Sequence, residues 1–184
     1  EQMDHLEMVA SRLLPILLDP NIEAVIESAR AFGNLSRTHM SRKTEPILYE
    51  TLLVLLDHDD PDVVYTVLGV LMNIAMKPRG REQLAASDLV SKSIEIVRSA
   101  GLKFLSLSTM ACKVLCNMST AGFESKVAGR LESTLDELIH AVSDEDDNES
   151  RDFVQVAKVL CRKCKTDGGL DLVPLDDVPQ LANR

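Results

Sequence analysis

The chain has 184 residues, a length typical of one domain, and 45% of them are hydrophobic, which is enough for a sizeable core. Only 3% are aromatic and none is tryptophan, so the core must consist of aliphatic side chains, as in packed helices rather than in a β-sandwich. The formal net charge of -9 argues against binding to nucleic acid through a broad basic face. No apolar run reaches the ~18–20 residues that span a bilayer.

Hydrophobic residues recur at helical spacing along most of the chain. This spacing predicts helices over residues 4–18, 20–36, 46–57, 61–76, 80–87, 89–99, 103–120, 123–142 and 150–165. At Asp19-Pro20 and Asp60-Pro61 we expect the aspartate to cap a helix and the proline to occupy its first position. The acidic stretch 143–149 is predicted to be a solvated loop, and residues 167–184 an irregular tail.

A six-residue motif recurs along the chain. It reads AFGNLS at 31–36, VLMNIA at 70–75, VLCNMS at 114–119 and, more weakly, VLCRKC at 159–164. The three asparagines are 39 and 44 residues apart, a period typical of HEAT and armadillo repeats. The sequence therefore predicts an all-α, armadillo-type right-handed helical solenoid of about four repeats over residues 1–166. The repeats are predicted to end near residues 37, 77, 121 and 165.

The motif asparagines are candidate contacts for a partner protein. Each amide donates and accepts hydrogen bonds, so a row of amides, one per repeat, is able to bind the backbone of an extended peptide. One helical turn earlier the residue is cationic in three of the four copies, which suits an acidic partner segment. These positions are Arg30, Gly69, Lys113 and Lys158. The predicted partner site on the concave face consists of Arg30, Asn34, Asn73, Lys113, Asn117 and Lys158.

A second interpretation of the asparagines is purely structural. In that interpretation each amide bonds to the backbone of a neighbouring repeat or ends its own helix. For Asn73 and Asn117 both interpretations stay open, whereas Asn34 is also placed to cap the last turn of its helix. Gly33 precedes Asn34 and costs the helix roughly 0.8–1 kcal/mol relative to alanine. We expect close packing against a neighbouring helix to explain that cost.

The four cysteines form two pairs at helical spacing. Cys112 and Cys116 are one turn apart, as are Cys161 and Cys164. Two such pairs on adjacent helices would be able to ligate zinc. However, Cys116 and Cys161 occupy the motif position that Gly33 holds in the first copy, which favours reduced thiols packed in the core. We therefore expect no metal and no cofactor, and a zinc-dependent module is the less favoured alternative.

The sequence shows no motif of an enzyme. It has no phosphate-binding loop, no dinucleotide-binding fingerprint and no nucleophile elbow. The four histidines lie in unrelated segments. The acidic stretch 57–62 lacks the central glycine and the distal glutamate of a calcium-binding EF-hand loop. We expect a non-enzymatic chain with no small-molecule substrate.

The motifs resemble those of the armadillo-repeat superfamily, and most closely the C-terminal region of the ciliary armadillo repeat-containing protein two family. The resemblance covers roughly residues 20–120 and rests on RAFGNLS at 30–36, GVLMN at 69–73 and CKVLCNMS at 112–119. It implies a scaffold or assembly factor of the ciliary or flagellar axoneme, linked to radial spokes and present in the cytoplasm and the cilium. Armadillo-class import adaptors place tryptophan one turn before the asparagine, and this chain has no tryptophan, which argues against an import adaptor.

Two further functions stay open at this point. In the first alternative, the chain is the structural end of a longer solenoid that docks through its convex side and its acidic loops at 57–62 and 144–149. In the second alternative, it is a general cytoplasmic or nuclear armadillo adaptor. It begins without methionine and almost at once enters a helical pattern, so we expect a fragment of a longer protein. In every case the expected partners are proteins, with no nucleic acid and no membrane.

Overall fold

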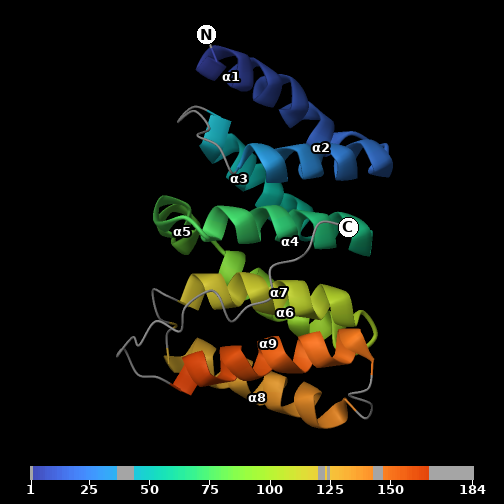
Figure 1. Ribbon diagram of the computed structural model, residues 1–184, viewed down its shortest axis with the longest axis vertical. Helices are drawn as coiled ribbons and strands as arrows, with labels where there is room; N and C mark the ends of the chain where they lie inside the picture. The colour runs from blue at the N-terminus through green and yellow to red at the C-terminus, as the bar shows by residue number, and fades with distance from the viewer. Residues whose placement is uncertain (1, 37–43, 120–122, 124, 143–146, 166–184) are drawn as a thin grey trace. The chain divides into compact units, whose positions relative to one another are not determined.

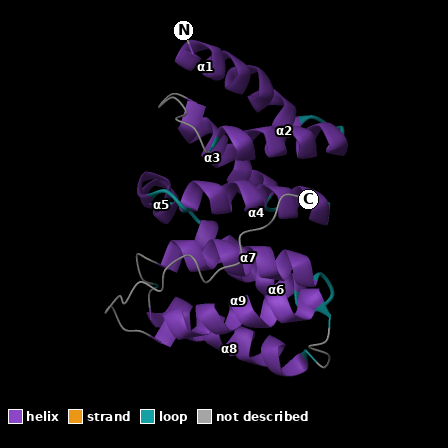
Figure 2. Cartoon of the chain, viewed as in Figure 1, coloured by secondary structure: helices purple, strands orange, loops and turns teal. Residues whose placement is uncertain are grey.

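The structure is a computed structural model that describes residues 2–36, 44–119, 123, 125–142 and 147–165. Within these ranges every regular element is a helix, so the predicted all-α class is confirmed (Figure 2). In chain order they are α1 (Gln2–Leu13), the short 3-10 helix η1 (Leu14–Leu18), α2 (Ile22–Leu35), α3 (Thr44–Leu55), α4 (Pro61–Ala75), α5 (Pro78–Ala85), α6 (Leu89–Ala100), α7 (Leu105–Met118), α8 (Ser125–Ala141) and α9 (Asn148–Lys165). The predicted tail at 167–184 lies outside the described residues, as do the repeat ends predicted near 37 and 121.

The chain divides into two compact units, with the boundary inside α6. Unit 1 is Glu1–Lys92 and unit 2 is Ser93–Arg184. In unit 1, α2 packs against α4 and η1, while α5 packs against α4 (Figure 1). In unit 2, α9 packs against both α7 and α8. The four motif copies lie on α2, α4, α7 and α9, so each unit contains one pair of motif helices, which we call the α2/α4 pair and the α7/α9 pair.

Local capping signals explain where α4 begins, and they correct the predicted start of α2. The Asp60 carboxylate accepts hydrogen bonds from the backbone N–H groups of Asp62 (2.9 Å) and Val63 (3.3 Å), and Pro61 is the first residue of α4, as predicted. At α2 the cap is Asn21 instead of Asp19. The Asp19 carboxylate accepts from the N–H of Asn21 at 2.8 Å, so it forms a turn before the helix and moves the cap forward by two residues.

The first predicted helix, 4–18, is interrupted. It forms α1 up to Leu13 and continues only as the tighter helix η1, in which Pro15 lies near the start. Proline has no amide hydrogen and its ring collides with the preceding turn, so a regular α-helix does not pass through it. The short helix predicted at 80–87 is found at Pro78–Ala85 as α5. A Cβ atom at Gly80 would lie 2.2 Å from the carbonyl oxygen of Ile74, so glycine is required where α5 meets the last turn of α4.

Unit 2 is built around α7. Every residue of α7 from Leu107 to Met118 is buried, and α9 contributes fully buried side chains such as Phe153 and Leu160. Gly101 ends α6 in a left-handed conformation with φ of 49°, which glycine adopts without strain. Part of the stretch predicted as a loop, Asn148 and Glu149, instead belongs to α9, because Asp147 caps this helix through the N–H of Ser150 at 2.8 Å.

Candidate protein-interaction site

The six predicted site residues do not form one uniformly exposed surface. Three are exposed, one is half-buried and two are buried, with Lys113 and Asn117 only 3% and 6% exposed. The exposed residues are Arg30, Asn34 and Lys158, and the half-buried residue is Asn73. Register in the repeat therefore does not by itself decide whether a side chain reaches the surface.

Lys113 lies in the interior of unit 2, which corrects its predicted position on a binding face. Its Nζ atom is 2.8 Å from Oδ2 of Asp152, so the ion pair joins α7 to α9. A buried ammonium is stable only with such a partner, because burial removes its hydration. Arg30 is exposed, but its guanidinium pairs with Glu27 one turn earlier on α2 at 2.5 Å. Two of the three cations in the predicted row are therefore already paired with carboxylates of the chain.

In the α2/α4 pair, the end of α2 receives donors from α4 and from the turn after it. The Asn73 amide Nδ2 donates to the carbonyl oxygen of Gly33 at 3.5 Å, and Oγ of Ser36 donates to the same oxygen at 2.8 Å. Nζ of Lys77 donates to the carbonyl oxygen of Ser36 at 2.6 Å. The last carbonyls of a helix have no partner within it, so these side chains satisfy them. For Asn73 the structure thus favours the structural interpretation.

The α7/α9 pair repeats this arrangement at the equivalent motif position. The carbonyl oxygen of Cys116 accepts from Oγ of Ser119 at 2.7 Å and from Nζ of Lys163 at 2.9 Å. We call the backbone oxygens of Gly33 and Cys116 the motif carbonyls. Sequence analysis missed the capping roles of Lys77 and Lys163. Lys77 follows the motif asparagine position by four residues and Lys163 follows it by one, so no common spacing indicates these roles in the sequence.

The two glycines of the α2/α4 pair differ in what surrounds them. A Cβ atom at Gly33 would lie 3.6 Å from Cγ2 of Val70 and 4.0 Å from Nδ2 of Asn73, which are ordinary contact distances. Close packing therefore does not require glycine at position 33, contrary to our expectation. A Cβ atom at Gly69 would meet nothing within 4 Å. Gly69 thus leaves open space beside the α4 backbone, one turn before Asn73.

The four cysteines are free thiols of the α7/α9 pair. Burial raises the pKa of Cys116 to about 12 and the pKa values of Cys161 and Cys164 to about 11, and it raises the pKa of Cys112 well above its ordinary value. In the described part of the chain, no three His, Cys, Asp or Glu side chains are grouped so as to hold a metal ion. The structure gives the zinc alternative no support.

Comparison with known proteins shows which proteins the chain resembles. No family model matches the chain. Over 113 residues it is 29% identical to "Armadillo repeat-containing protein 2" of Mus musculus and 28% identical to the Homo sapiens protein of that name. The chain therefore resembles armadillo repeat-containing protein 2. The matches cover 60% of this chain but only 13% of the length of these relatives.

Two solved structures resemble the chain at the level of the fold. One crystal structure of an engineered protein aligns with a TM-score of 0.59 and 17% sequence identity, covering 85% of this chain and 62% of the other. A second engineered protein aligns with a TM-score of 0.58 and 18% identity, covering 80% and 61%. At these identities the likeness concerns the fold alone, and it agrees with the predicted all-α class. No helix in the described ranges combines the length and the apolar character needed to cross a membrane.

Proposed function

We propose that this armadillo-type chain is a non-enzymatic scaffold for partner proteins and belongs to a component or assembly factor of the ciliary or flagellar axoneme linked to radial spokes. The armadillo fold and the similarity to armadillo repeat-containing protein 2 support the interaction scaffold. The ciliary assignment rests on the resemblance of the motif sequences and predicts a location in the cytoplasm and the axoneme.

The observation that carries the scaffold function is the open face of the α2/α4 pair. Arg30 and Asn34 are exposed one turn apart on α2, and the side chain of Arg30 is 62% exposed. On α4, Gly69 stands at the motif position of Arg30 and has no side chain to cover the backbone. An extended partner segment is therefore able to approach α4 closely while the Asn34 amide bonds to its backbone.

The acidic loop at 57–62 is a weaker candidate for the contact. Asp60 is used to cap α4, and Asp57 forms an ion pair with Lys92 on α6. The corresponding prediction for residues 144–149 falls mostly outside the described residues. Arg30 is likewise paired, but Asn34 is exposed on the same helix, so α2 offers an amide that is able to bond to the backbone of a partner.

A pull-down from ciliated cells tests the proposal with the full-length protein and a double variant, Arg30→Glu with Asn34→Ala. We expect radial-spoke or other axonemal proteins to be recovered by the wild type and lost by the variant. Arg98→Glu is a matched control because Arg98 is 68% exposed and pairs with Glu95 in the same i, i+3 geometry as Arg30 with Glu27.

The results separate the two parts of the proposal. Axonemal recovery that survives the double variant would move the contact to another surface. Recovery of transport receptors or adhesion proteins in place of axonemal proteins would contradict the ciliary assignment and favour a general cytoplasmic or nuclear adaptor. Charge reversal at Lys113 is unsuitable for this test, because its ammonium is buried and bound to Asp152.

A further inference from the structure

One helix face in unit 2 has a charge opposite to the net charge of -9 on the whole chain. Along α9, the residues that form this face are all exposed, and they are Arg151, Gln155, Lys158, Arg162 and Lys165. At 3.6 residues per turn, the four cations fall within an arc of about 60° and extend over about 21 Å. No acidic side chain of α9, which is described throughout, lies in that arc. We call these five residues the basic stripe.

Helix stability does not account for the whole stripe. The helix dipole favours cations only in the last turn, whereas Arg151 lies near the start of α9 and Lys158 lies in its middle. At the start of α9, the guanidinium of Arg151 donates to Oδ1 of Asn148 at 3.1 Å and to the carbonyl oxygen of Asp147 at 3.4 Å. Two carboxylates near this end are bound within the fold, whereas Glu149 is exposed. Asp152 pairs with buried Lys113, and Asp147 accepts from the N–H of Ser150.

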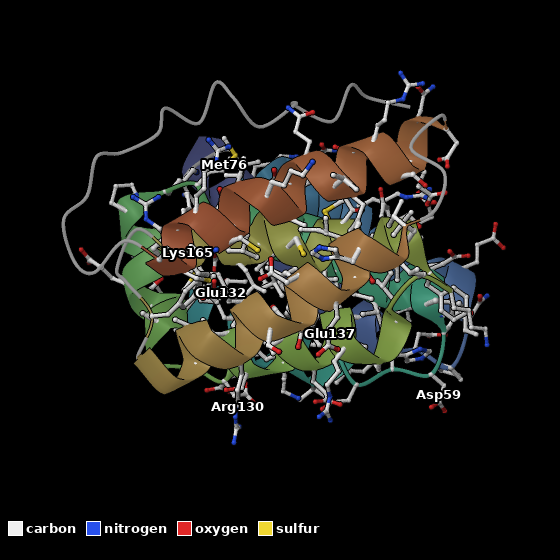
Figure 3. The ribbon with its side chains drawn as sticks, turned by 90° about the horizontal axis from the view of Figure 1, so that it is seen from below. Asp59, Met76, Arg130, Glu132, Glu137 and Lys165 are labelled. Carbon is white, nitrogen blue, oxygen red and sulfur yellow. The ribbon has the colours of Figure 1, made fainter. Side chains whose placement is uncertain are left out.

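The other end of the stripe is fixed by α8. Nζ of Lys165 is 2.9 Å from Oε1 of Glu132, and both residues are labelled in Figure 3. The side chain of Lys165 is still 59% exposed in this pair. The pair anchors the last turn of α9, and Arg151, Lys158 and Arg162 are the other exposed cations of the stripe.

The stripe is not a general property of the repeat. In the register that aligns Asn34 with Arg162, the α2 positions equivalent to Arg151 and Gln155 are Glu23 and Glu27, both exposed. The matched face of α2 is therefore acidic at the start, whereas that of α9 is basic along its length. A repeat scaffold needs no such change in order to fold, so the charge on α9 requires a different explanation.

We propose that the basic stripe binds an acidic segment of a partner protein that carries carboxylates at about one helical turn of spacing. Such a segment would place a carboxylate opposite each cation along α9, and electrostatic attraction would make its association salt-dependent. A protein segment fits better than nucleic acid because the stripe has no aromatic side chain on which bases stack.

Fluorescence anisotropy of the purified chain tests this directly. The probe is a labelled helical peptide with a glutamate at every third or fourth position, beside an equal-length glutamine peptide. The stripe variant is Arg151→Gln, Lys158→Gln, Arg162→Gln. The control variant, Arg12→Gln, Arg98→Gln, Lys103→Gln, makes the same charge change at exposed positions outside the stripe.

We expect the stripe variant to bind the acidic peptide at least about tenfold more weakly and the control variant to lose less than about twofold. Circular dichroism establishes that both variants are folded. Equal losses in the two variants would show a response to net charge alone and would overturn the proposal. Tighter binding of a single-stranded oligonucleotide of equal charge would also overturn it, in favour of a nucleic-acid surface.

This stripe and the α2/α4 face are separate proposals that can fail independently. If the Arg30 and Asn34 variant loses axonemal recovery but binds the acidic peptide as the wild type does, the α2/α4 face is supported. The basic stripe is then judged from the anisotropy experiment with its own variant. Intact axonemal recovery with no binding of the acidic peptide would overturn the stripe alone.

Discussion

The α2/α4 pair and the α7/α9 pair use the same backbone acceptor with different donors. In both pairs the motif carbonyl accepts a serine hydroxyl three residues later, from Ser36 or Ser119. The donor from the next motif helix is a neutral amide, Asn73, in unit 1 and a charged ammonium, Lys163, in unit 2. The motif carbonyl therefore has a donor from the next motif helix in both pairs, but the donor group differs between them.

The cation one turn before the motif shows a larger difference. Arg30 is exposed, whereas its counterpart Lys113 is buried against Asp152. The residue of α4 equivalent to Asp152 is Val63, which is fully buried. A carboxylate on the facing helix is thus present where this cation is buried and absent where it is exposed. We infer that the neighbouring helix sets the exposure of this motif position.

The largest expected difference between the units is their sensitivity to alkali. The four thiols with raised pKa values all lie in unit 2. Since their folded-state pKa values exceed the ordinary value of 9.0, the unfolded chain loses these protons first as the pH rises. Stability present below pH 9 should be lost as the pH rises from 9 towards about 11 for Cys161 and Cys164 and towards about 12 for Cys116.

Two sets of residues report on the units separately. Both tyrosines, Tyr49 and Tyr65, are in unit 1, and all the cysteines are in unit 2. Urea unfolding at about pH 8 and about pH 10, followed by tyrosine fluorescence and by pulsed thiol labelling, should show the larger loss for the thiols. Burial also raises the pKa of Tyr49 to about 12, so unit 1 should respond with the same sign but over pH 10 to about 12. Equal shifts of the two signals would contradict the prediction.

The second prediction concerns the cation one turn before the motif. Lys113→Ala should lower the free energy of unfolding of unit 2 by about 3 kcal/mol, because it leaves the carboxylate of Asp152 unpaired. This is the lower end of the range for buried pairs, since the side chain of Asp152 is 34% exposed. Arg30→Ala should cost less than about 0.5 kcal/mol, as for other exposed pairs. Urea unfolding monitored by thiol labelling and by tyrosine fluorescence measures both.

A double variant tests whether Asp152 is the cause. Lys113→Met with Asp152→Val gives the α7/α9 pair the apolar residue that α4 has at Val63. It should regain most of the stability lost in Lys113→Ala, because replacing both members of a buried ion pair by apolar groups is often neutral. A double variant as unstable as the single one would show that the loss comes from packing of the Lys113 stem.

The third and smallest effect concerns the residue that bears the motif carbonyl. Gly33→Ala should stabilise unit 1 by up to about 1 kcal/mol, because the added methyl group makes only ordinary contacts and alanine favours the helix. Cys116→Gly should destabilise unit 2 by about 2 kcal/mol, through lost helix propensity and a small cavity. Thermal unfolding of the two variants checks the opposite signs. A lower melting temperature for Gly33→Ala would restore close packing as the reason for the glycine.

The helices and their repeat register could be predicted because their signals are local. The spacing of apolar residues defines each helix, and the adjacent residues Asp60 and Pro61 mark the start of α4. The buried pair of Lys113 and Asp152 could not be predicted, because its members are 39 residues apart and their pairing depends on how α7 meets α9. The same reason applies to Asn73 and Lys77, whose acceptors lie one repeat earlier. The partner-binding role of Arg30, Asn34 and Lys158 stays a prediction, since exposure alone does not identify a partner.

The lysines that cap the ends of α2 and α7 lie later in the chain than the carbonyl groups they bind. Lys77 donates to Ser36, which lies 41 residues earlier in the chain, and Lys163 donates to Cys116, 47 residues earlier. On the ribosome the earlier helix is made first, so the end of α2 stays bonded to water until the following repeat has been synthesised and has folded against it. Each of these repeats thus completes the one before it, and a nascent chain that stops after α2 lacks both its amide donor and its ammonium donor.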